Sequence, residues 1–333
     1  MNTMKRSMAS PTAKTKFLCA AGAILLLALT AAGLMVGKYP LSLEKLIAGD
    51  ELQRRVFTTL RLSRVAVGLF GGFALGVAGF VFQTVFRNPL ASPDIIGVSS
   101  GASAGAAAGI LFCSGTAAVT ASAFAGAVAA VLLALALATL DRNGKSGTIV
   151  LAGIAVHSLA QTVLMCLKLT ADPERELASI EYWIMGSLNS VNANAVHGNL
   201  LLCIVCLAVL FLLHRQMLLL AAEEGEARTL GVNVGFLRLI VLASATLTVA
   251  NVVSLTGLIS FVGLLAPHGA RLLTKNNRIG TMLLAGIAGA VLLLAADILA
   301  RSVAATEVPV SIFTSLIGAP FLISLLVRGR RAV

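Results

Sequence analysis

The chain has 333 residues, of which 58% are hydrophobic and only 12% are charged, and its mean hydropathy is +0.96. A soluble domain has no core large enough to hide so much apolar surface, so lipid must be the solvent for most of this chain. The formal net charge of +11 is better explained by lysine and arginine enrichment in cytoplasmic loops than by nucleic acid binding. Because each span needs about 20 apolar residues, the length accommodates about ten helices and no large soluble domain.

The first apolar run follows a basic N-terminal tail. Residues 1–16 carry four lysine and arginine residues, and the run continues from Phe17 to about Gly37. A secretory signal peptide is the alternative, since Ala31-Ala32-Gly33 resembles a weak cleavage site, but its apolar region would be only about 7–15 residues long. The run therefore predicts an uncleaved first span with a cytoplasmic tail at 1–16.

Eight further apolar segments are long enough to predict spanning helices. They cover residues 64–86, 94–112, 116–140, 146–169, 192–213, 235–257, 281–300 and 308–327. A tenth segment, 258–273, is short and contains Pro267, so it predicts a half-helix or a broken span. The sequence thus predicts an all-α polytopic membrane protein of about ten spans, with a single transmembrane domain over 1–333.

Charge supports an orientation with both termini in the cytoplasm. With the loops assigned in this way, 16 of the 25 lysine and arginine residues fall on the inner side, and the outer side has no net charge. Two outer loops are long, 38–63 and 170–191. The second contains Trp183 beside Tyr182, which predicts a short helix anchored at the membrane interface.

Small residues recur at every fourth position in two of the predicted spans. This spacing places glycines on one helix face and predicts close helix packing. The glycines concerned are Gly68, Gly72, Gly76, Gly97, Gly101, Gly105 and Gly109. Segments 64–140 and 238–300 each contain a Pro-containing break, and this loose similarity suggests an inverted repeat.

The residues that carry enzyme chemistry are scattered. The four histidines lie in different segments without metal-ligand spacing, and the pair Cys203 and Cys206 lies mid-helix, so no metal site is predicted. The stretch "NGKSG" ends like a nucleotide-binding loop, but Thr139 stands where that loop needs its first glycine. The sequence therefore predicts neither a nucleotide site nor any other cofactor in this chain, and no catalytic activity.

Ionisable residues within the predicted spans are also few. Ion-coupled carriers keep carboxylates near mid-membrane, and the nearest case here is Asp297 with Arg301, one turn apart near an outer helix end. A local i,i+4 ion pair at the interface is the favoured explanation of these two residues. A secondary carrier is thus disfavoured, although it stays open, as does a purely structural membrane scaffold.

Four stretches, in order along nearly the whole chain, resemble one family. They are "RLSRVAVGLFGGFALGVAGFVFQTVFRNPLASPDIIGVSSGAS" (61–103), "EARTLGVNV" (226–234), "GLISFVGLLAPHGARLL" (257–273) and "LLLAADILARSVAATEVPVSIFTSLIGAPFLISLL" (292–326). The chain resembles the membrane permease subunits of binding-protein-dependent ABC importers for ferric siderophores, haem and cobalamin. Ser63, where the family has proline, and Gly269, where it has a bulky apolar residue, are small departures.

This resemblance implies a coupling loop at 219–234. In the family, the matching loop forms a short helix that docks into a groove of the cytoplasmic ATPase. The local sequence agrees, because acidic residues favour a helix N-terminus and glycine favours its C-terminus. The implied coupling residues are Glu226, Ala227, Arg228, Leu230 and Gly231.

The resemblance also implies docking and gating residues. Arg61, Arg64 and Arg301 match outer-face positions that pair with acidic residues of the substrate-binding protein, as suits the bidentate guanidinium group. The cytoplasmic mouth of the pathway is expected at Asn88, Leu90, Ser146 and Thr148, with an ordinary Asn-Pro turn as the alternative. His157 and Gln161 are expected to face the pathway or, alternatively, to hydrogen bond between helices.

The function implied by the resemblance is that of a permease subunit in the inner membrane of a bacterium. It would act with a second permease copy or a paralogue, two copies of an ATPase that binds ATP and Mg²⁺, and a periplasmic or lipid-anchored binding protein. The motif "RNPLASPDIIGVSSG" most resembles that of ferric-siderophore members, which makes an iron-siderophore complex the first expectation. Haem and cobalamin are the alternatives.

Overall fold

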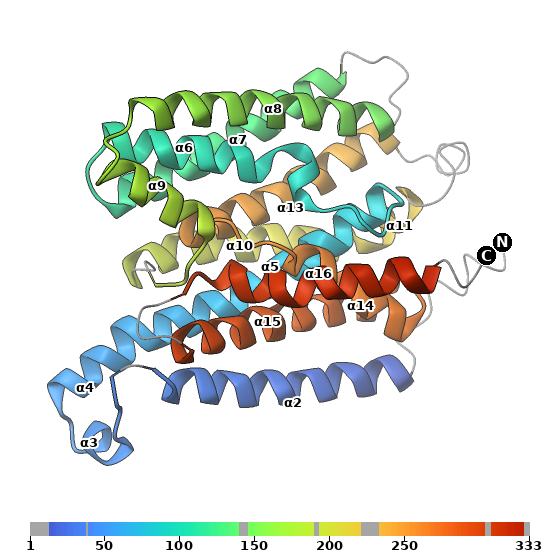
Figure 1. The fold of residues 1–333 in the computed structure, drawn as a ribbon. Coiled ribbons are helices and arrows are strands. Elements are labelled where there is room, and N and C mark those ends of the chain that lie inside the picture. Colours follow the sequence, from blue (N-terminus) through green and yellow to red (C-terminus); the bar gives the residue numbers. More distant parts are fainter. Residues whose placement is uncertain are drawn as a thin grey trace.

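The protein is helical wherever the structure assigns regular secondary structure (Figure 1). The computed structural model describes residues 13–37, 39–139, 146–189, 193–220, 233–303 and 308–329. Its elements, in chain order, are α2 (Ala13–Met35), α3 (Leu43–Ile47), α4 (Glu51–Arg55), a π-helical segment (Val56–Leu62), α5 (Ser63–Val85), a 3₁₀ turn (Pro93–Ile96), α6 (Val98–Phe112), α7 (Thr116–Thr139), α8 (Ser146–Thr170), α9 (Glu176–Met185), α10 (Ala193–Leu212), α11 (His214–Leu220), α13 (Val234–Thr256), α14 (Val262–Thr274), α15 (Ile279–Ser302) and α16 (Val310–Gly329).

Six of the described helices are long and apolar enough to cross a membrane. The bent pair α10 and α11, which meet at 63°, makes a seventh if it is counted as one span, and α6 and the first part of α16 are shorter apolar helices. The prediction of a polytopic all-α protein is confirmed at this level. The count of ten spans and the inverted repeat stay predictions.

The core lies around α5, which packs against α15 and, separately, against α13. Phe80 of α5, Leu242 of α13 and Leu293 of α15 are fully buried. By contrast, α2 and α8 expose rows of large apolar side chains, such as Phe17 and Leu169. Exposed apolar rows on long helices fit contact with lipid or with another membrane chain.

Glycines bring α5 against α15, as the fourfold spacing predicts. A Cβ atom added to Gly72 would lie 2.6 Å from the carbonyl oxygen of Gly289, and one added to Gly76 would collide with the carbonyl of Ala285. In the same way, Gly101 and Gly105 bring α6 onto the backbone of α7. These helices pack backbone to backbone, and they come this close only because glycine has no side chain to hold them apart.

The break near residues 258–273 lies elsewhere than the sequence suggests. Helix α14 continues through Pro267, and the chain turns before it, where Gly257 and Phe261 have positive φ angles of 71° and 67°. Pro267 has no N–H to donate to the carbonyl of Gly263, and Gly79 lets α5 lie directly on that carbonyl. The proline is thus accommodated inside the helix, and the interruption falls in the preceding segment.

The outer loop predicted at 38–63 is helical in its second half. One continuous helical segment runs from Glu51 to Val85, with the π-helical segment near its start. Ser63 lies within this segment, and unlike the family's proline it has an N–H for the helix ladder. The loop at 170–191 does contain the short helix predicted around Trp183, which is α9.

Candidate functional site

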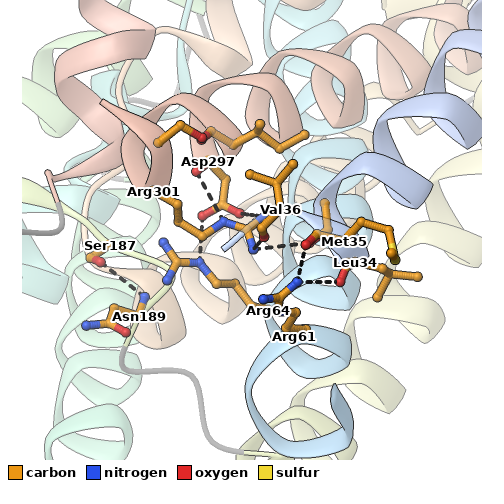
Figure 2. Close-up of polar contacts among 12 residues, drawn as sticks. Leu34, Met35, Val36, Arg61, Arg64, Ser187, Asn189, Asp297 and Arg301 are labelled. Carbon is orange, nitrogen blue, oxygen red and sulfur yellow. Dashed lines mark hydrogen bonds and ion pairs between the residues drawn. The ribbon is translucent and has the colours of Figure 1, made fainter. Parts of the chain in front are cut away.

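A buried ion-pair network joins α5 to α15 near the end of α2 (Figure 2). The carboxylate of Asp297, on α15, is fully buried. Arg64 donates from Nε to Asp297 Oδ1 at 2.7 Å, and Arg301 Nη2 lies 2.9 Å from Asp297 Oδ2. One carboxylate therefore holds two guanidinium groups whose side chains are 7% and 4% exposed.

Two arginines also bind the carbonyl groups at the end of α2. Arg301 Nη1 donates to the carbonyls of Gly33 at 3.1 Å and Val36 at 3.0 Å. Arg61, in the π-helical segment, donates to the carbonyls of Leu34 (2.9 Å), Met35 and Tyr39. The last turn of α2 has no basic residue of its own, so these two guanidinium groups supply the positive charge that favours a helix C-terminus.

The three arginines expected to dock a partner therefore lie together, but they point inward. Counted over the whole residue, Arg61 is 4% exposed, and Arg64 and Arg301 are each 6% exposed. The sequence predicted the i,i+4 pair of Asp297 and Arg301, which is confirmed, although the pair is buried among helices rather than exposed at an interface. The contact of Asp297 with Arg64 was not predicted, because 233 residues separate the two.

The expected gate residues lie at turns and on α8. The side chain of Asn88 accepts a hydrogen bond from the N–H of Leu90 at 2.9 Å, which is the Asn-Pro turn geometry, and both residues are exposed. Ser146 and Thr148 form the first turn of α8, and the side chain of Ser146 is outside the described part. The gating role of all four stays a prediction.

His157 and Gln161 lie one turn apart on α8 and are half-buried. The backbone of α8 at His157 packs on the start of α6, because a Cβ atom on Gly97 would lie 3.2 Å from the His157 nitrogen. Leu151 and Leu159 of α8 are exposed. The two polar residues thus flank the face of α8 that contacts the rest of the chain.

The expected coupling residues, Glu226, Ala227, Arg228, Leu230 and Gly231, lie outside the described residues. The structure resumes at Asn233, whose side chain caps α13 by accepting from the N–H of Phe236 at 3.1 Å. On the other side, α11 ends at Leu220. The coupling role is therefore an expectation from the sequence alone.

A further arginine, Arg271, ties α14 to the end of α5, and the sequence predicts no role for it. Arg271 Nη2 donates to Thr84 Oγ1 at 2.6 Å and to the carbonyl of Phe80 at 3.0 Å, while Nη1 bonds Gln83. The guanidinium carbon also lies 4.3 Å from the centre of the Phe80 ring, in cation–π geometry. Arg271 is the last residue of the motif "PHGAR". Its place in that motif is the sequence signal from which a role for it could have been predicted.

A cavity of about 1030 Å³ lies beside α9, between the α6–α7 turn and the end of α13. Tyr182 and Trp183 of α9 line it together with Arg175, Thr120 and Thr256. Its volume is that of a site for a drug-sized ligand. Trp183 is the single tryptophan of the protein.

Comparison with known proteins identifies the family. A model of the FecCD transport family matches residues 25–328. The chain belongs to the FecCD transport family. This FecCD chain is 39% identical to a cobalamin import system permease protein of Halobacterium salinarum, over 83% of this chain and 74% of the relative. It is 35% identical to the ferric enterobactin transport system permease protein of Escherichia coli, over 83% of each chain.

The fold agrees with this membership. A solved structure described as an inward-facing conformation of a metal-chelate type ABC transporter superposes on the FecCD chain with a TM-score of 0.85. The two chains are 32% identical, and the match covers 94% of this chain and 99% of the other. Other relatives are named for molybdate and for hemin, so the family's named substrates differ.

Proposed function

We propose that this chain is the permease subunit of an ATP-driven importer that moves an iron-siderophore complex across the inner membrane of a bacterium. The observation that carries the importer class is the family match over residues 25–328, on a chain with at least six helices apolar enough to span. The siderophore choice rests on the relative named for ferric enterobactin and on the motif "RNPLASPDIIGVSSG".

The permease supplies the path, and a separate ATPase supplies the energy. In this proposal two ATPase subunits bind ATP and Mg²⁺ on the cytoplasmic side. The loop 219–234 is the contact through which hydrolysis changes access, with Glu226, Ala227, Arg228, Leu230 and Gly231 in the ATPase groove. The gate at the cytoplasmic mouth consists of Asn88, Leu90, Ser146 and Thr148, and His157 and Gln161 face the path.

The proposed assembly has two permease chains, either two copies or a pair of paralogues. Each crosses the membrane about ten times, with both termini in the cytoplasm, as the distribution of basic residues favours. The end of the bundle that holds Arg61, Arg64 and Arg301 then faces outward. A periplasmic or lipid-anchored binding protein docks there through acidic residues.

Cobalamin is the second candidate ligand, because the relative with 39% identity is named for cobalamin import. Hemin follows for the same reason. All three ligands are large organic complexes of a metal, and the binding protein sets most of the selectivity.

Transport by the reconstituted complex tests the proposal. The permease, the co-encoded ATPase and the co-encoded binding protein are placed in vesicles, and uptake of radiolabelled ferric enterobactin, cobalamin and hemin is compared. We expect uptake of one ligand that requires the binding protein, the ATPase and ATP together. Uptake that persists without the ATPase would contradict the importer class and favour a secondary carrier.

A further inference from the structure

A polar cavity, separate from the arginine network, lies inside the helix bundle. Its volume is about 240 Å³, and Leu75, at the middle of α5, is among its apolar lining residues. The helical segment that ends with α5 is one of those apolar enough to span, so the cavity lies at membrane depth. Its polar wall is made by the turn that leads into α6, by the start of α6 and by the turn that leads into α14. The polar side chains of this wall are Ser92, Asp94, Ser99 and Ser260.

Asp94 is the one charged side chain among the described residues that line this cavity. Its carboxylate accepts hydrogen bonds from the hydroxyls of Ser99 and, at 3.4 Å, of Ser92, and both donors are neutral. The residue is exposed, so its charge faces the open space of the cavity. A carboxylate at membrane depth is costly, and such residues typically mark a water-filled cavity or the path of a ligand.

The two turns of the polar wall rest on α8 and on α16. A Cβ atom added to Gly153 of α8 would lie 2.0 Å from the carbonyl oxygen of Ile95, and one added to Gly318 of α16 would lie 2.4 Å from the ring of Phe261. His157, also on α8, packs with its backbone on the start of α6 and is one of the residues assigned to the path in the proposed function. The cavity therefore adjoins the helix that is proposed to line the path.

The charge of Asp94 discriminates between ligands that reach this cavity. Water and salt screen charges less inside a membrane protein than at its surface, so an anionic ligand would be repelled there. A cationic group, or an N–H donor of a neutral ligand, can instead replace a serine hydroxyl as the partner of the carboxylate. We propose that this cavity is a binding position on the translocation path that accepts neutral and cationic ligands and repels anionic ones.

This inference rests on the proposed function, since it requires that the chain conduct a ligand, and it narrows the class of that ligand. Each catecholate group carries two negative charges and each hydroxamate group carries one. Three catecholates therefore leave an iron(III) complex strongly anionic, whereas three hydroxamates neutralise the metal. We expect the iron complex to be of the hydroxamate type, with no net negative charge. Cobalamin, the second candidate, also meets this condition.

The experiment measures how fast thiol reagents of opposite charge reach the cavity in the full-length permease–ATPase complex in lipid nanodiscs. Ser260→Cys places a thiol in the polar wall. The reagents are the cationic trimethylammonium-ethyl methanethiosulfonate and the anionic sulfonato-ethyl methanethiosulfonate. Because both rates are measured at the same thiol, their ratio cancels any effect of Asp94 on the reactivity of the thiol itself.

The control thiol is the native Cys113, which is exposed just after the end of α6. Asp94 precedes this helix, whose 15 residues span about 22 Å. Salt screens an exposed charge over such a distance. The other accessible cysteines, Cys19 and Cys166, are replaced by alanine in every protein, and Cys113 is replaced as well where Ser260→Cys is present.

We expect the ratio of the cationic to the anionic rate to be at least about tenfold higher at Ser260→Cys than at Cys113, because the carboxylate attracts cations into the cavity. Asp94→Asn keeps the shape of the side chain and removes its charge, so it should bring the two ratios within about threefold of each other. The inference is overturned if Asp94→Asn leaves the ratio unchanged. It is also overturned if neither reagent reacts at Ser260→Cys, since both are smaller than any metal chelate.

Ser99→Ala covers the case in which Asp94→Asn fails to fold. It removes a neutral partner of the carboxylate and leaves the charge in place. A preference for the cationic reagent that is equal or higher supports the inference. Loss of this preference overturns it, because Asp94 would then serve only to hold the turn through Ser99.

Uptake by the wild-type complex tests the ligand class. The probes are ferrioxamine B, a cationic tris-hydroxamate complex, and ferric enterobactin, an anionic tris-catecholate complex. Faster uptake of ferrioxamine B supports the inference, and faster uptake of ferric enterobactin overturns it. If neither probe is taken up, the thiol rates decide. A cation-selective cavity in a complex whose uptake does not require the ATPase would instead contradict the proposed function.

Discussion

At the residue scale, Asp297 is the acid on which two buried cations depend. Both of its oxygens face guanidinium groups, those of Arg64 at 2.7 Å and Arg301 at 2.9 Å. We expect Asp297→Ala to lower the free energy of unfolding by about 3–5 kcal/mol, since it leaves two charges buried without their acid. Thermal unfolding in detergent measures this loss.

The matched control for Asp297→Ala is Glu51→Ala. Glu51 also pairs with an arginine at i,i+4, Arg55, at 3.3 Å, but the two side chains are 83% and 77% exposed. An exposed pair of this kind contributes little because water and salt screen it. Equal unfolding midpoints for the two variants would show that the buried Asp297 network contributes no more to stability than an exposed ion pair does.

At the element scale, the contact of α5 with α15 depends on the absence of side chains. We expect Gly72→Ala to destabilise the protein by roughly 1–3 kcal/mol or more, because the added methyl group meets the backbone of Gly289 at 2.6 Å and a backbone cannot rotate away. The measurement is the thermal unfolding midpoint of the variant relative to the wild type.

Gly269→Ala makes the same substitution in α14, where no atom outside the adjoining backbone of its own helix lies within 4 Å of the added methyl group. There we expect no loss, or a gain of about 0.5–1 kcal/mol, since alanine suits a helix interior better than glycine. If both variants lower the midpoint equally, the effect belongs to glycine replacement in general and not to the contact between α5 and α15.

The elements also show how far a sequence predicts this fold. Long apolar runs identified the six described helices that are long and apolar enough to span, and the fourfold glycine spacing identified the faces at which α5 and α6 pack. The helical stretch 51–62 was missed, because its charged and polar residues look like a loop until Arg61 is seen to bind the end of α2. Pro267 was misjudged: α14 continues through it, and the chain turns earlier, at Gly257 and Phe261, whose φ angles are positive.

The candidate site was predicted in the same uneven way. Motif residues identified Arg61, Arg64 and Arg301, but nothing in the sequence marked Asp297 as the partner of Arg64, since the contact joins α5 to α15 across the chain. Nor did it show that the guanidinium groups point inward. Side-chain direction follows from packing among α2, α5 and α15, and local patterns do not encode that packing.

At the scale of the whole molecule, the proposed function requires that energy from a separate ATPase reach the helices of this chain. The proposed entry point is the loop 219–234, which connects α11 to α13, and α13 contacts α5 and α7 in the core. We expect Gly231→Val to lower uptake at least about tenfold, because the resemblance implies that a coupling helix ends at Gly231, and a β-branched residue is strongly disfavoured in the left-handed conformation that commonly ends a helix. Bulky substitutions at Glu226 and Ala227 are expected to act similarly by blocking entry into the ATPase groove.

The measurement for these variants is made in reconstituted vesicles. ATP hydrolysis should continue while uptake falls, and the amount of inserted permease should not change. Gly269→Ala, which replaces a glycine of α14 with open space around it, is the control. Uptake that matches the wild type in Gly231→Val would place the coupling contact elsewhere on the cytoplasmic face.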